Sequence, residues 1–186
     1  MATYSHVVVV MSILLSLSIT QLLKGIAQLY RSRSRVKLYW LHSAWVVLLI
    51  FFSLLLWWTY WQYREIQEWS FFRFVLYLSP TVVFYFITAI VIPDPSEAIE
   101  DLRQYYFANR AGFFGTFAFY GMLAGLTAIL VRGLPVLDPS NLVRLAMVLL
   151  LLIAMRSTKE RVHAIVLALG ITLMLVFIVL FQFRLG

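Results

Sequence analysis

The sequence lacks cysteine and is poor in charge. It has no cysteine among its 186 residues, which excludes disulfide bonds, thiolate metal sites and cysteine nucleophiles. Charged residues make up 12% of the chain and hydrophobic residues 63%, whereas a soluble domain has about 25% and about 45–50%. The mean hydropathy is +0.91. These values exclude a soluble domain and a disordered chain, and they indicate an integral membrane protein.

Catalytic and metal-binding patterns are also missing. The three histidines, His6, His42 and His163, lie on separate segments, and none has the spacing of a helical zinc motif. Aspartate and glutamate are absent from the long apolar stretches, although a charge near the bilayer centre is the usual mark of a proton relay or a coupled transporter. We therefore expect no catalytic residue, no metal and no cofactor, and these absences argue against proton-coupled transport.

Six stretches of the chain are long and apolar enough to cross a bilayer, whose hydrocarbon core of about 30 Å needs about 20 apolar residues in a helix. The fifth stretch is short, but Pro139 and Ser140 resemble a helix start that would lengthen it. The sequence predicts an all-α bundle of six transmembrane helices, a single domain over 1–186. The expected spans are 7–26, 41–60, 72–92, 113–131, 142–155 and 164–183.

The basic residues are distributed unevenly between the junctions. Ten of the fifteen lysines and arginines lie at the first, third and fifth junctions, and the other five lie on the opposite side. Because cytoplasmic loops carry the excess of positive charge, we expect these three junctions in the cytoplasm and both termini outside it. The expected location is the bacterial inner (plasma) membrane, as a multi-pass protein.

Four of the five basic residues at the first junction form one short run, Arg31, Arg33, Arg35 and Lys37, and the fifth is Lys24. They act as a topology signal, and they are also suited to contact anionic lipid headgroups. A short segment tethered to the membrane is not expected to bind nucleic acid.

The third junction predicts a short amphipathic helix over about 95–107, lying on the membrane between helices three and four. Asp94 is placed to cap it, Pro95 suits its first position, and Glu97 completes a capping box. A capped connector is the main interpretation. A partner surface, or a cation site made of Asp94, Glu97 and Asp101, are the alternatives.

The first helix has a polar stripe in an otherwise apolar span. Ser12, Ser16 and Thr20 are spaced by four residues, and Gln21 lies beside them. Such a stripe packs against another helix, bonds its hydroxyls to backbone carbonyls, or lines a water path. Helix packing is the main interpretation, and pore lining is the alternative.

The third helix contains a proline near its middle, in the sequence Ser79-Pro80-Thr81. Proline removes a backbone donor and kinks a helix, and the two neighbouring hydroxyls are placed to satisfy the freed carbonyl. A static kink and a gating hinge are both compatible with this pattern.

The fourth helix carries Gly121 and Gly125, a spacing that permits close approach of two helices. We expect close packing there, within one chain or between copies.

Several segments together resemble a group of small, uncharacterised bacterial six-helix membrane proteins. They are the end of the first helix, Ile19-Thr20-Gln21-Leu22-Leu23, the segment Val36-Lys37-Leu38-Tyr39-Trp40, the pair Trp57-Trp58, and Asp101-Leu102-Arg103-Gln104-Tyr105-Tyr106. The resemblance covers most of the chain. It implies the same fold, and it implies no activity or site residue.

Three functional hypotheses follow. The first is a non-enzymatic module that works through membrane partners, for assembly, anchoring or sensing. The second is a small oligomeric channel or facilitator whose pore is lined by the first helix. The third is a membrane enzyme on lipid-like substrates. The expected partners are the lipid bilayer with its anionic headgroups, and a second copy or another membrane protein.

Overall fold

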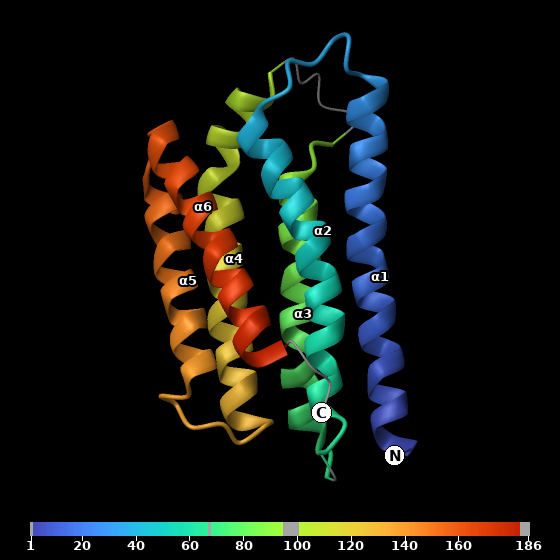
Figure 1. The fold of residues 1–186 in the computed structure, drawn as a ribbon. Helices are drawn as coiled ribbons and strands as arrows, with labels where there is room; N and C mark the ends of the chain where they lie inside the picture. Colours follow the sequence, from blue (N-terminus) through green and yellow to red (C-terminus); the bar gives the residue numbers. More distant parts are fainter. Residues whose placement is uncertain (1, 67, 95–100, 183–186) are drawn as a thin grey trace.

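A computed structural model describes residues 2–66, 68–94 and 101–182, whose main elements are helices (Figure 1). Six of these helices are long and apolar enough to cross a membrane. They are α1 (Ala2–Arg31), α2 (Trp40–Tyr60), α3 (Phe71–Val91), α4 (Leu102–Leu130), α5 (Pro139–Arg156) and α6 (Glu160–Phe177). A short 3-10 helix, η1 (Trp61–Tyr63), follows α2, and a π-helical turn, η2 (Ile178–Gln182), follows α6.

The six helices confirm the all-α prediction, but all of them begin before the expected spans, by one residue in α2 and α3 and by several in the others. Helix α5 begins at Pro139, as the proline suggested, because Asp138 caps it and proline suits the first helical position. Helix α4 begins at Leu102, 11 residues before the span expected from 113. Residues 102–107 of the predicted interfacial helix therefore form the first turns of α4, and Asp101 is its N-cap. The other residues of that prediction, 95–100, lie outside the described residues.

A side-chain cap explains where α4 begins. Asp101 accepts hydrogen bonds from the backbone nitrogens of Arg103 (2.7 Å) and Gln104 (3.4 Å), which satisfies two of the free donors at the helix start. The preceding peptide is also held, because Leu102 N donates to Lys37 O over 3.0 Å. The loop after α1 is thus fastened to the first turn of α4.

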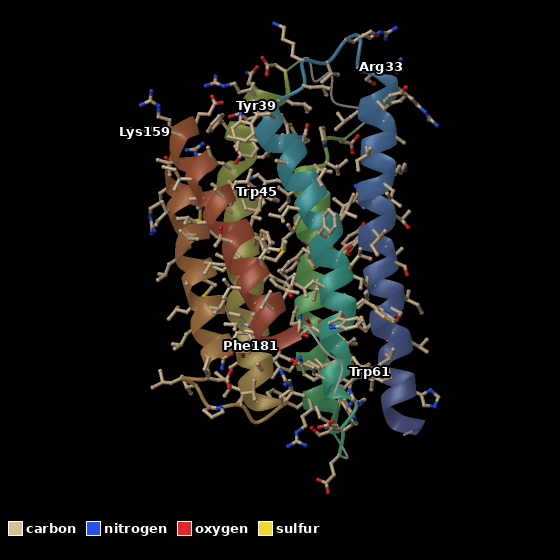
Figure 2. The ribbon with its side chains drawn as sticks, in the orientation of Figure 1. Arg33, Tyr39, Trp45, Trp61, Lys159 and Phe181 are labelled. Atoms are coloured by element: carbon tan, nitrogen blue, oxygen red, sulfur yellow. The ribbon has the colours of Figure 1, made fainter. Side chains whose placement is uncertain are left out.

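The helices alternate in direction, so the junctions fall at two opposite ends of the bundle (Figure 1). The junctions α1–α2, α3–α4 and α5–α6 lie together at what we call the basic end. Arg33 and Lys159 mark this end in Figure 2, and Trp61 marks the opposite end. The exposed basic side chains of the basic end include Arg31, Arg33, Arg35, Lys37, Arg103, Arg156, Lys159 and Arg161.

The bundle has two layers. Helices α5, α4, α3 and α1 pack side by side in that order, and α6 and α2 lie across one face of the row (Figure 1). The buried Trp45 ring of α2 fills the space above α4, with ring centroids 5.7 Å from Phe113, 5.3 Å from Phe114 and 6.2 Å from Phe117. These edge-to-face contacts are favourable geometries for aromatic pairs, and they hold α2 on α4.

Only one of the two glycines in the predicted pair permits a close approach. A Cβ atom at Gly121 would lie 2.6 Å from Cγ2 of Val148, so α4 and α5 touch there with no room for a side chain. A Cβ atom at Gly125 would meet nothing within 4 Å. The spacing therefore marks one contact inside the chain, and the second glycine is not needed for it.

Candidate functional site

A cavity of about 130 Å³ lies between α2, α4, α5 and α6, with Pro80 of α3 at its wall. On the scale where one water needs roughly 10–15 Å³, it has space for several atoms of a ligand. Its lining is mostly apolar, and its aromatic and aliphatic members include Phe52, Leu55, Leu56, Phe117, Val143, Met147, Leu151, Leu173, Met174 and Phe177. Mostly apolar walls with a few polar groups are typical of small-molecule sites.

Arg144 is the one charged side chain among the described residues that line this cavity. It lies in the second turn of α5, and its Nη1 donates to Ser140 Oγ (3.0 Å) and Asn141 Oδ1 (2.7 Å). Its guanidinium carbon is 5.1 Å from the centre of the Phe177 ring. Within the described part of the chain it forms no salt bridge, since the bridges found there join Arg64 to Glu65 and Arg103 to Glu160.

Asp138 is the acid closest in sequence to Arg144, and its carboxylate is engaged elsewhere. Oδ1 accepts from Ser140 N (2.9 Å) and Ser140 Oγ (2.5 Å) as the cap of α5. These hydrogen bonds, with the charges of Arg144 and Arg132, hold the pKa of Asp138 below its usual value. The cap therefore stays ionised at neutral pH, and it stabilises the start of α5 until the pH falls through this lowered pKa.

Tyrosine and threonine hydroxyls supply the other polar groups of the lining. Tyr60, Tyr63 and Tyr120 reach it from α2, η1 and α4. The Tyr60 hydroxyl is paired with Thr81 Oγ1 over 2.7 Å, whereas the hydroxyls of Tyr63 and Tyr120 make no hydrogen bond within the described residues. The lining residues of the described chain include no carboxylate, histidine or lysine. This arrangement is suited to binding.

The residues around Pro80 are fastened to both neighbouring helices. Proline leaves Leu76 O without its helical donor, and this carbonyl accepts from Ser79 Oγ (2.8 Å) and from Thr127 Oγ1 of α4 (3.1 Å). The single proton of the Thr127 hydroxyl is shared between Leu76 O and Leu123 O, a carbonyl of its own helix that lies 2.8 Å away. Ser79 thus has the role expected of it. Thr81 does not, because it bonds to Tyr60 of α2 instead. These contacts hold the segment around Pro80 against α2 and α4.

The polar stripe of α1 is partly exposed in the described chain. Ser16 and Thr20 are exposed, and Ser12 and Gln21 are half-buried. Ser16 Oγ donates to Ser12 O over 2.7 Å, which satisfies that hydroxyl within the helix. The neighbouring Ser18 is the buried hydroxyl of α1. None of the four residues of the stripe is among those that line the cavity, so the packing and pore-lining interpretations of the stripe both stay predictions.

A second polar cluster, at the basic end, was not found from the sequence. His163 Nε2 lies 3.0 Å from Ser157 O, and a carbonyl only accepts, so Nε2 carries the proton. Nδ1 then accepts from the Tyr106 hydroxyl over 2.8 Å. These bonds join α6 to α4 and to the α5–α6 junction, and both side chains are buried, which gives the cluster a structural role.

An ion pair closes the outer side of the same cluster. The Glu160 carboxylate forms an ion pair with Arg103 Nη2 (3.4 Å) and accepts a hydrogen bond from Trp40 Nε1 (3.2 Å). These contacts join α6 to α4 and, through Trp40, to α2. Burial, together with the nearby Glu160 carboxylate, raises the pKa of Tyr39 to about 12, so its hydroxyl stays neutral. The run of four basic residues in the first junction is exposed and lies apart from the cavity, at the other end of the bundle.

Sequence reasoning missed the part that Arg144 plays. An arginine near the end of an apolar span normally extends to the headgroups, and nothing in the spacing shows that this one lines a cavity. Its signal is weak: Ser140, Asn141 and Arg144 put three polar groups on one face of an apolar helix.

The comparisons with known proteins add no relative. No family model, no curated protein and no solved structure matches this chain. The fold and the site therefore stand on the residues of the chain itself.

Proposed function

We propose that this chain is an integral membrane protein of the bacterial inner membrane and that all six helices cross the bilayer. The support is the outer surface of the bundle, where large apolar side chains such as Ile13, Phe51 and Leu149 are more than half exposed. In water such a surface would be a large apolar patch. Exposed tryptophans at the helix ends, Trp40 and Trp61, suit the headgroup level.

In this proposal the basic end lies in the cytoplasm and both termini lie outside. Three junctions gather at that end, and exposed Arg31, Arg33, Arg35 and Lys37 are placed to contact anionic headgroups. The cavity with Arg144 then lies in the outer half of the membrane.

The natural absence of cysteine gives a direct test of this orientation. A single cysteine is introduced as Ser34→Cys at the basic end or as Val136→Cys in the α4–α5 loop, where both positions are exposed. We expect a membrane-impermeant maleimide to label Val136→Cys on intact spheroplasts and to label Ser34→Cys only after permeabilisation. The opposite pattern would invert the topology, and labelling of both on intact spheroplasts would refute a single orientation.

The function we propose is a non-enzymatic binding module, used in assembly, anchoring or sensing. The observation that carries it is the composition of the cavity: apolar walls, one arginine and hydroxyls, with no acid–base pair among the described lining residues. An enzyme on lipid-like substrates has less support, because tyrosine hydroxyls are the groups of the described lining that would have to act as general acid and base. The partly exposed stripe of α1 provides a face for a membrane partner or a second copy.

A channel remains the second candidate because the stripe of α1 would line a pore if several copies surrounded one axis. We expect purified protein in proteoliposomes to give no ion or small-solute flux above that of empty liposomes. Flux that Ser16→Leu abolishes, in a variant that inserts and folds normally, would replace the binding module with an oligomeric channel.

A further inference from the structure

The cavity combines two features that few ligands match together. Its walls are made of leucine, methionine, valine and phenylalanine side chains, which favour an alkyl chain. At its edge is the guanidinium of Arg144, which forms no salt bridge with a described residue and uses only Nη1 for the hydrogen bonds found there. Its remaining N–H groups have the planar geometry that matches a carboxylate or a phosphate.

The surroundings of Arg144 strengthen the preference for an anion. A second arginine, Arg132, lies 5.7 Å from the centre of the Tyr63 ring at the same end of the bundle, and Asp138 is occupied as a helix cap. Two positive guanidinium groups, of Arg132 and Arg144, therefore lie near one carboxylate, and that carboxylate is already hydrogen-bonded as a helix cap. Tyr63 and Tyr120 line the cavity within electrostatic range of Arg144, and their hydroxyls are suitable donors to an oxyanion.

We propose that the cavity binds an anionic amphiphile, with its alkyl chain between α2, α4, α5 and α6 and its oxyanion headgroup on Arg144. An uncharged amphiphile would leave the guanidinium partly desolvated without an anionic partner, which is unfavourable. A cationic one would be repelled. The inference rests on the proposed binding function and gives it a ligand class; a fatty-acid anion and an anionic phospholipid share the required chemistry.

Binding of radiolabelled palmitate and of hexadecanol to the purified protein in detergent tests the headgroup. We expect palmitate to bind the natural protein at least about tenfold more tightly than hexadecanol, because a hydrogen bond to a charged group is worth about a tenfold or greater change. Arg144→Gln should remove this preference, and Arg144→Lys should retain part of it. The matched control is Arg73→Gln, in the first turn of α3 at the same end but outside the cavity.

A filled cavity tests the site of the alkyl chain. Ala124→Leu adds volume to the lining, whereas Gly125→Leu adds it next to the same position, where a Cβ meets nothing within 4 Å and the residue does not line the cavity. We expect Ala124→Leu to weaken both palmitate and hexadecanol by about tenfold, since displacing several buried methylenes costs at least that much. Gly125→Leu should weaken neither.

Mass spectrometry of the intact protein released from nanodiscs distinguishes the two sources of the headgroup. Retention of phosphatidylglycerol over phosphatidylcholine, lost in Arg144→Gln, assigns the site to a phospholipid, and retention of palmitate alone assigns it to a fatty acid. Equal binding of palmitate and hexadecanol, together with no preference for phosphatidylglycerol, would overturn the proposal. So would unchanged binding of both anions in a folded Arg144→Gln variant. Neither result depends on the orientation or flux experiments. A wrong ligand class can therefore be distinguished from a wrong proposed function.

Discussion

Gly121→Val is expected to lower the free energy of unfolding by about 2–3 kcal/mol, the usual upper range for an added side chain in a close-packed contact. The new Cβ would lie 2.6 Å from Val148 Cγ2 on α5. Val148 is 5% exposed, and its branched side chain has little rotational freedom with which to move away. The helices α4 and α5 would have to separate along their shared contact.

Gly125→Val is the matched control for this substitution. It makes the same chemical change one helical turn later, where a Cβ meets nothing within 4 Å. We expect its unfolding free energy to stay within about 0.5 kcal/mol of the natural protein or to rise, because glycine is a poor helix former. The measurement is reversible unfolding in mixed micelles, followed by tryptophan fluorescence. Equal stability of the two variants would contradict the close approach at Gly121.

The second large effect concerns the carbonyl of Leu76. The double substitution Ser79→Ala with Thr127→Val removes both of its hydroxyl donors, and Pro80 offers no backbone donor in their place. A buried carbonyl left without a partner costs about 1–3 kcal/mol. We expect a loss of that size in the unfolding free energy, with each single substitution costing much less because the other hydroxyl still donates.

The control for this effect restores the backbone donor. In a Pro80→Ala background, the new N–H at position 80 reaches Leu76 O in the regular helical pattern. The same double substitution should then cost less than about 1 kcal/mol. A double-mutant cycle across the two backgrounds measures the difference. An equal cost with and without Pro80 would show that the hydroxyls stabilise the helix in some other way.

The outcome around Pro80 illustrates how far the sequence alone extends. A proline in an apolar helix has to leave one carbonyl unpaired, so the sequence predicts both the problem and the nearby hydroxyl that helps to solve it. It does not predict Thr127, which comes from another helix 51 residues away. Thr81 was equally plausible as a donor, but the packing of α2 against α3 gives it Tyr60 instead.

The sequence by itself determined the number of helices, their approximate spans and the clustering of positive charge at one end. These depend on helical length, apolar composition and the order of the junctions, which are local properties. It also indicated Pro139 and Ser140 as an alternative start of α5, ahead of the expected span from 142, because proline suits the first helical position.

Only the tertiary structure decided which face of each helix is buried. Ser16 and Thr20 of α1 are exposed whereas Ser18 is buried, only Gly121 of the glycine pair touches a neighbour, and Arg144 lines a cavity. In apolar helices the hydrophobic pattern is nearly uniform around the axis, so periodicity does not identify the inner face. Close packing between particular helices makes that choice, and it places Arg144 beside tyrosines from two other elements.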